Sequence, residues 1–182
     1  MLTEWRKFKG WLVLEYFLKN PTDRIHIKHL SRILKISPRT AEVYLKLYRD
    51  KGILKSERIG NILRFYLNNE NPLVKSLKRT YFLMVLNGFD IERFLKENGI
   101  ISFCIYGSFA SGEYSEESDI NILIISPRKK IDLRELKFLE EVFDADLDIQ
   151  IFTPGEWRKI SKINKEFYKE VKSNYIVYGA DI

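Results

Sequence analysis

The chain has 182 residues, 45% of them hydrophobic and 14% aromatic, which is enough for one large domain or two small ones with packed cores. Cys104 is the single cysteine, so the sequence excludes an internal disulfide and a cysteine-based zinc site. No apolar run reaches the roughly 18 to 20 uncharged residues of a membrane span, and the first residues lack a signal-type pattern. We therefore expect a cytoplasmic protein, and the abundance of Ile, Lys and Glu beside a single glutamine is typical of thermophiles.

The formal charge of +6 is unevenly distributed along the chain. Residues 1–70 hold 15 Lys and Arg against 7 Asp and Glu, a net charge of +8, whereas residues 71–182 hold 16 against 18, a net charge of −2. A basic front segment favours a polyanionic partner, with a solvated basic surface as the alternative.

The basic segment is expected to begin with three helices. Apolar residues recur at helical spacing in WLVLEYFLK, where Asn20-Pro21 ends the pattern, and again in KHLSRILK. Ser37 can cap a third helix with Pro38 in its first position. That helix carries the apolar residues Val43, Tyr44, Leu47 and Tyr48 and stops at Lys51-Gly52.

The stretch ILKSERIGNILRFYLNN predicts two strands joined by a turn at Gly60-Asn61. Three helices closed by such a hairpin make residues 8–69 similar to the winged helix-turn-helix domains of transcription regulators. The resemblance implies binding of double-stranded DNA through the third helix and the wing. The cations and polar residues in those places are Arg39, Thr40, Lys46, Arg58 and Arg64.

The physical case for DNA binding rests on where these side chains stand. The first residues of a recognition helix point into the major groove, where Arg39 can make paired hydrogen bonds to a guanine edge. The wing cations Arg58 and Arg64 would contact phosphate and hold the register. The alternative is that these are ordinary solvated charges on a small helical domain that binds protein.

Residues 71–98 are predicted to form linking helices. The first begins with Asn71 as its cap, followed by Pro72. Its apolar stripe, made of Leu73, Leu77, Tyr81, Met84 and Val85, predicts either packing on the second domain or a homodimer contact.

The acidic back half contains two candidate site segments. In ISFCIYGSFASGEYSEESDINILIIS, an apolar strand breaks at Gly107-Ser108 and a second strand begins near Asp119. The backbone N–H groups of the small-residue turn and the Ser108 hydroxyl can surround a phosphate. Further on, FDADLDIQIF alternates Asp146, Asp148 and Gln150 on one face of a strand, and the following TPGE predicts a helix capping box.

Gly107, Ser108, Gly112, Ser118 and Asp119 stand where the nucleotidyltransferase superfamily related to DNA polymerase beta has its signature. The chain from about residue 90 to its end resembles the minimal nucleotidyltransferase branch of this superfamily. Together, the two resemblances suggest an archaeal-type regulator in which a winged helix-turn-helix domain is fused to a minimal nucleotidyltransferase domain. The resemblance implies that Gly107, Ser108 and Ser118 hold the phosphates of a nucleoside triphosphate. It also implies Mg²⁺ at Asp119, with Asp148 as the third acid and Asp146 as the alternative.

Asn121 occupies the position of the second metal-binding aspartate. Residues 119 and 121 project to the same face of a strand, so the amide keeps an oxygen there but loses a full negative charge. At an effective dielectric near 20, that charge is worth on the order of several kcal/mol against a divalent ion before desolvation. We expect impaired transfer, unless Glu113, Glu116 or Glu117 replaces the missing acid.

The expected fold is α+β, with a winged helix-turn-helix at residues 1–70, linking helices at 71–98 and an α/β nucleotidyltransferase-like domain with a small mixed sheet at 99–182. The favoured function is a DNA-binding transcriptional regulator whose second domain binds nucleotide or a partner. The alternative is an active Mg²⁺-dependent enzyme that moves a nucleoside monophosphate from a triphosphate to an unknown acceptor. Kinship alone adds a toxin-like protein partner.

Overall fold

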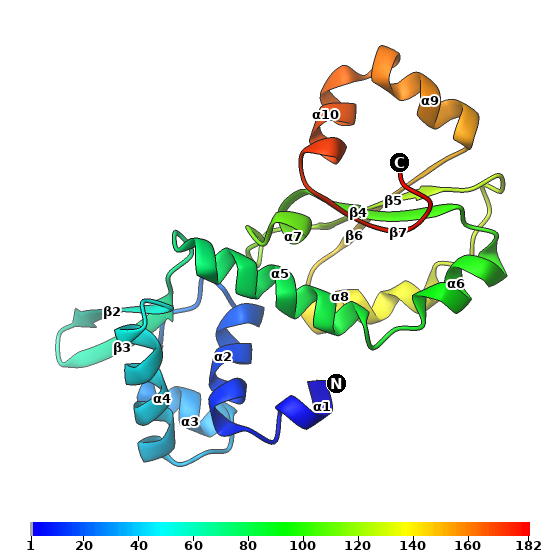
Figure 1. The fold of residues 1–182 in the computed structure, drawn as a ribbon. Helices are drawn as coiled ribbons and strands as arrows, with labels where there is room; N and C mark the ends of the chain where they lie inside the picture. The colour runs from blue at the N-terminus through cyan, green and yellow to red at the C-terminus, as the bar shows by residue number, and fades with distance from the viewer. Residues whose placement is uncertain (1) are drawn as a thin grey trace. The chain divides into compact units, whose positions relative to one another are not determined.

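The computed structural model describes residues 2–182 and divides into two compact units, residues 1–88 and 89–182 (Figure 1). Residues 71–98 are split between them, since the helix that follows Asn71 belongs to the first unit and the next helix to the second. Within the described residues, no helix is long and apolar enough to cross a membrane.

The first unit combines helices with a 3-stranded antiparallel sheet of order β1-β3-β2. Its elements are α1 (Leu2–Trp5), α2 (Lys9–Lys19), β1 (Ile25–His26), α3 (Ile27–Ile33), α4 (Pro38–Asp50), β2 (Leu54–Ile59), β3 (Ile62–Leu67) and α5 (Pro72–Leu86). The predicted start of α4 is confirmed, because the Ser37 hydroxyl accepts a hydrogen bond from the Thr40 N–H at 3.0 Å. The Asn71 side chain caps α5 in the same way.

The core of the first unit draws on nearly every element, with Val13, Phe17, Leu30, Leu45 and Phe65 all buried. The apolar faces predicted for α4 and α5 are only partly correct, because some residues predicted to face the core are exposed. On α4 the seam that faces the core is Ala41 and Leu45, whereas Val43 and Leu47 are 49% and 44% exposed. On α5, Tyr81 and Val85 are buried but Leu73 is 52% exposed.

A buried carboxylate, that of Glu15, joins α2 to α5 and to the segment that precedes α2. Glu15 is 5% exposed, and the Arg6 Nε lies 3.0 Å from both of its carboxylate oxygens. The Tyr81 hydroxyl donates to the same carboxylate at 3.1 Å. Burial, followed by the negative charge of Glu15, raises the pKa of Tyr81. No local sequence pattern indicates this cluster, because Tyr81 is distant along the chain from Arg6 and Glu15.

The second unit is built on a 4-stranded sheet of order β6-β5-β4-β7, in which β5 and β6 are parallel and the other pairs antiparallel. Its elements are α6 (Ile91–Asn98), β4 (Ser102–Tyr106), α7 (Gly107–Ser111), β5 (Ile120–Ile125), the 3-10 turn η1 (Arg134–Leu136), α8 (Lys137–Phe143), β6 (Leu147–Phe152), α9 (Pro154–Ile163), α10 (Lys165–Ser173) and β7 (Tyr175–Gly179). The α+β class and the small mixed sheet are therefore confirmed.

Helices cover both faces of this sheet, with α9 and α10 on one face and α6 and α8 on the other (Figure 1). Cys104 and Leu123 pack on the α9 and α10 side with Trp157 and Val171. Cys104 is fully buried and thus a core residue, and this burial raises the pKa of its thiol to about 12. The predicted capping box at Thr153 and Glu156 is present at the start of α9.

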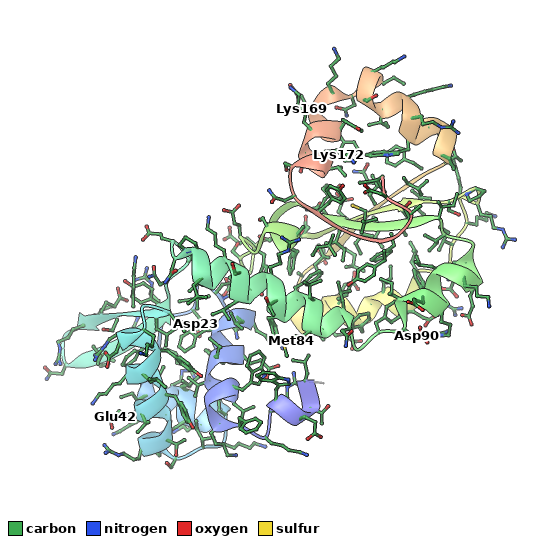
Figure 2. The ribbon with its side chains drawn as sticks, viewed as in Figure 1. Asp23, Glu42, Met84, Asp90, Lys169 and Lys172 are labelled. Atoms are coloured by element: carbon green, nitrogen blue, oxygen red, sulfur yellow. The ribbon has the colours of Figure 1, made fainter. Side chains whose placement is uncertain are left out.

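Lys172 on α10 contacts the last described residues of the second unit (Figure 2). The Lys172 ammonium lies 4.9 Å from the centre of the Tyr175 ring and donates to the carbonyl oxygen of Ile182. These contacts hold α10 beside β7.

Gly179 at the end of β7 is expected to tolerate no larger residue. Its φ is +87°, and a Cβ there would lie 2.4 Å from the Ile101 carbonyl oxygen. We expect Gly179→Ala to lower the free energy of unfolding by about 2 kcal/mol, from backbone strain and this clash. Urea denaturation measures the loss.

Gly60→Ala is the matched control for that substitution. Gly60 has a φ of +57° but nothing within 4 Å of its ideal Cβ. An alanine there would therefore introduce the backbone strain without a steric clash. We expect a loss of about 1 kcal/mol there. Equal losses at the two positions would show that the close contact with Ile101 contributes nothing.

Candidate functional site

The candidate site begins where β4 turns directly into α7 at Gly107. This residue has a φ of +72°, a left-handed conformation that favours glycine. A Cβ on it would lie 3.1 Å from the Asn121 Nδ2, so the turn and the neighbouring strand approach each other closely. The predicted phosphate turn thus takes the form of a short helix, Gly107–Ser111, beside Asn121.

The strand register aligns the predicted site residues across the sheet. Tyr106 on β4 pairs with Asn121 on β5, and Asn121 pairs with Asp148 on β6. Paired residues share a face, and Asp119 lies two residues before Asn121 on the same chain, so it shares that face as well. The register therefore places Asn121 beside Asp148 and close to Gly107, with Asp119 just before the start of β5.

Asp146 also belongs to this neighbourhood, since the Ile120 N–H donates to its carbonyl oxygen at 2.8 Å. Asp119, Asp146 and Asp148 are exposed, whereas Asn121 is half-buried. The Asn121 amide has a long contact of 3.5 Å with the Asp119 carbonyl oxygen. The amide thus lies against backbone at the base of the site, and the carboxylates lie in solvent around it.

Tyr106 marks the boundary between the site and the core. It is 2% exposed, and the Phe167 ring of α10 packs edge-on against it with ring centroids 5.9 Å apart. Burial, then the negative charges of Asp148 and Glu170, raise the pKa of Tyr106 to about 12. Its phenol therefore stays protonated at neutral pH.

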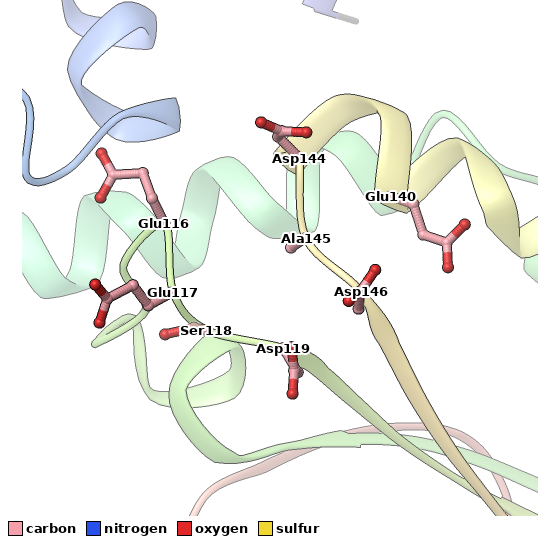
Figure 3. A pocket seen from close by; sticks show the side chains of 8 residues that line it. All are labelled: Glu116, Glu117, Ser118, Asp119, Glu140, Asp144, Ala145 and Asp146. Carbon is pink, nitrogen blue, oxygen red and sulfur yellow. The ribbon is translucent and has the colours of Figure 1, made fainter.

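An acidic pocket of ≈ 370 Å³ opens next to Asp119 (Figure 3). Its lining comes from the loop before β5, from α8 and from the loop before β6, and consists of Glu116, Glu117, Ser118, Asp119, Glu140, Asp144, Ala145 and Asp146. In Figure 3 the carboxylates of Glu116, Glu117 and Asp144 point away from that of Asp119. Glu116 and Glu117 were expected near the site from the sequence, whereas Glu140 was not, because nothing local to α8 connects it to this loop.

The two candidate phosphate-binding serines have different surroundings. The Ser118 hydroxyl accepts a hydrogen bond from the Ser115 N–H at 2.9 Å and so closes the loop before Asp119. Ser108 belongs to α7, and its carbonyl oxygen accepts from the Glu113 N–H at 2.8 Å. Of the two, Ser108 lies in the turn beside Asn121, whereas the Ser118 hydroxyl already shapes the loop.

The side chains around Asp119 do not fit a strong divalent-metal site. Over residues 2–182, no three His, Cys, Asp or Glu side chains converge as metal ligands would. The Asn121 amide lies next to Asp148 on the neighbouring strand and two residues from Asp119. Mg²⁺ sites of this kind depend on carboxylates together with substrate phosphates, and an amide supplies no negative charge. Around Gly107 the chain thus has two carboxylates, Asp119 and Asp148, and one amide, Asn121.

The predicted DNA-binding residues of α4 lie on its outer surface. Arg39 has a side chain that is 83% exposed and stands 3.7 Å from Glu42, which also holds Lys46 at 2.6 Å. Figure 2 shows Glu42 on α4. The hydrogen bond from Lys46 lowers the pKa of Glu42, so this carboxylate is charged at neutral pH. Thr40 instead bonds the Ser37 hydroxyl at 2.8 Å and supports the helix cap.

The hairpin does not bring its two predicted cations to one face. Arg58 pairs with Leu63 and Glu57 pairs with Arg64, so Arg58 and Arg64 project to opposite faces. Arg64 shares its face with Glu57, which forms an ion pair with Arg24. Arg58 lies near the exposed tip, while Arg64 lies on the face opposite the buried Phe65.

Comparison with known families matches residues 90–178 to the nucleotidyltransferase domain. Comparison with curated proteins gives no significant match. The matched segment lies within the second unit and includes Gly107, Asp119, Asn121 and Asp148. The chain therefore contains a nucleotidyltransferase domain, as its sequence indicated.

Proposed function

We propose that this chain, in which residues 90–178 form a nucleotidyltransferase domain, is a DNA-binding regulator whose nucleotidyltransferase domain has lost efficient transfer activity. The domain would keep weak nucleotide binding at the turn that starts at Gly107. Formation of a homodimer, binding of a nucleotide and pairing with a toxin-like protein stay predictions.

The observation that carries the DNA-binding proposal is the arrangement of the first unit. A helix, a short strand, two further helices and a hairpin follow in order, and the short strand β1 joins the hairpin sheet next to β3. This is the order of a winged helix-turn-helix domain, in which the third helix is the reading element. That helix, α4, turns Arg39 and Lys46 to solvent, and residues 1–70 supply a net charge of +8.

Glu42 provides a sharp test of this proposal. The Glu42 carboxylate forms ion pairs with both Arg39 and Lys46, so DNA phosphates would have to compete with it for these cations. We expect Glu42→Gln to tighten binding to double-stranded DNA about fivefold, since it removes a repulsive charge and releases two cations. Arg39→Ala is expected to weaken binding about tenfold and to reduce discrimination between sites that differ in one G·C pair.

Fluorescence anisotropy with duplexes selected from a random pool measures these affinities. Arg64→Ala is the comparison variant, because it removes the same charge from the hairpin, where a phosphate contact carries no sequence information, and we expect it to weaken binding to all sites alike without reducing discrimination between them. If Glu42→Gln weakens binding, or Arg39→Ala and Arg64→Ala change discrimination equally, α4 is not the DNA-reading element.

The impaired transfer activity is supported by the Asn121 position. Asn121 lies in register with Asp148 and two residues from Asp119, which supports the proposal that an amide here replaces a second metal-binding carboxylate. Incubation with labelled nucleoside triphosphates, Mg²⁺ or Mn²⁺ and candidate acceptors tests it. We expect no incorporation that depends on Asp119; incorporation that disappears in Asp119→Asn would favour the enzyme instead.

A further inference from the structure

A second pocket lies in the first unit, apart from the acidic site. It has a volume of ≈ 420 Å³ and is lined by Glu4, Trp5, Phe8, Trp11 and Tyr48. These residues come from α1, the turn that follows it, the start of α2 and the end of α4. Its volume is within the range of small-molecule sites, which are concave, mainly apolar and furnished with few polar groups.

The pocket is aromatic on most of its lining. The rings of Trp5 and Trp11 have centroids 5.2 Å apart at an interplanar angle of 56°. Trp5 is 46% exposed and Phe8 68% exposed, so large ring surfaces remain open to a ligand. Flat aromatic molecules pack well on such surfaces, because offset and edge-on ring contacts add to the burial of apolar area.

The charges at the rim are already neutralised. The Glu4 carboxylate holds the Lys7 ammonium at 2.6 Å, and Arg6 is engaged by Glu15. The Tyr48 hydroxyl donates to the Gly10 carbonyl oxygen at 2.8 Å. The pocket therefore favours an uncharged ligand.

Trp11 supplies the polar group that remains. Its indole Nε1 is shielded from solvent and has no hydrogen-bond partner, a state shared within residues 2–182 only by the Asn68 Oδ1. A buried donor without an acceptor is unfavourable, and an acceptor that reaches it removes this penalty. Since α1 contains no buried residue, Trp5 and its neighbours can shift to admit a ligand without opening the core.

We propose that this pocket binds a flat, uncharged aromatic molecule that carries one hydrogen-bond acceptor. The ligand packs against the open ring surfaces of Trp5 and Phe8 and accepts a hydrogen bond from the Trp11 Nε1. This inference is independent of the proposed function, because it involves neither the acidic site nor DNA. Tyr48 stands on α4, so the ligand also touches the helix that carries Arg39.

The test uses two probes that differ in one ring atom, quinoline and naphthalene. Quinoline is neutral at pH 7.5 and carries a ring-nitrogen acceptor that naphthalene lacks. The chain has 3 tryptophans, so two-dimensional NMR of the ¹⁵N-labelled full chain gives an indole N–H signal for each. We expect quinoline to move the Trp11 indole proton signal downfield in a saturable way and to bind about fivefold more tightly than naphthalene.

Two internal controls accompany the titration. Trp157 is 7% exposed in the second unit, and its signal should not move. Trp11→Phe keeps a ring but removes the N–H, so it should weaken quinoline binding about fivefold and leave naphthalene binding unchanged. The proposal is overturned if the Trp11 signal does not saturate with quinoline, if Trp157 responds equally, or if the two probes bind with the same affinity.

Discussion

Replacing Asn121 with aspartate is expected to raise the affinity of the nucleotidyltransferase domain for Mn²⁺ at least tenfold. The new carboxylate would stand in register with Asp148 and two residues from Asp119, on the same face of the sheet. One added charge against a divalent ion is worth on the order of several kcal/mol before desolvation, and a tenfold gain requires about 1.4 kcal/mol. Isothermal calorimetry on the full chain measures the two affinities.

The apo form of the same variant should be less stable. Three carboxylates on one face repel each other, so the melting temperature of Asn121→Asp should fall without metal and recover when Mn²⁺ is added. Asn61→Asp makes the same chemical change at the hairpin turn of the first unit and should alter neither property. Unchanged Mn²⁺ affinity in Asn121→Asp would mean that Asn121 is not at the metal position.

Arg6→Ala is expected to lower the free energy of unfolding by about 3 kcal/mol. The substitution leaves the Glu15 carboxylate, 5% exposed, with the Tyr81 hydroxyl as its remaining side-chain donor among the hydrogen bonds described above. A buried charge that loses its partner costs about 3–5 kcal/mol, and the lower end applies because the Arg6 side chain is 49% exposed. Urea denaturation followed by tryptophan fluorescence measures the effect.

Lys7→Ala is the control from the same segment. Lys7 pairs with Glu4 at 2.6 Å, but both side chains are exposed, so we expect a loss below about 0.5 kcal/mol. Adding Glu15→Gln to Arg6→Ala should recover about half of the lost stability, because the uncompensated charge is removed. Similar losses in Arg6→Ala and Lys7→Ala would show that burial of Glu15 does not control the energy of this pair.

Features set by neighbouring residues were predictable from the sequence. The caps at Ser37, Asn71 and Thr153 depend on contacts within three residues, and all of them form as expected. The motif that contains Gly107 and Asp119 was equally visible, because fixed spacing places its members on one turn and one strand. The nucleotidyltransferase domain could be identified for that reason.

Features that depend on long-range packing were not predictable. Periodicity gave α4 an apolar side but not its phase, so Val43 and Leu47 proved exposed while Ala41 and Leu45 face the core. The same holds for Glu140 in the acidic pocket and for the cluster of Arg6, Glu15 and Tyr81. These contacts exist only after helices distant in the sequence pack together.

The most direct test of the account is the salt dependence of DNA binding by the full chain. Anisotropy with a selected 30-base-pair duplex should give a straight line of log affinity against log salt concentration between about 50 and 200 mM. Two or three phosphate contacts, including Lys46 and Arg58, predict a slope of about −2 to −3, unchanged by EDTA. Absence of binding, or binding that salt does not weaken, would contradict the claim that the first unit recognises DNA.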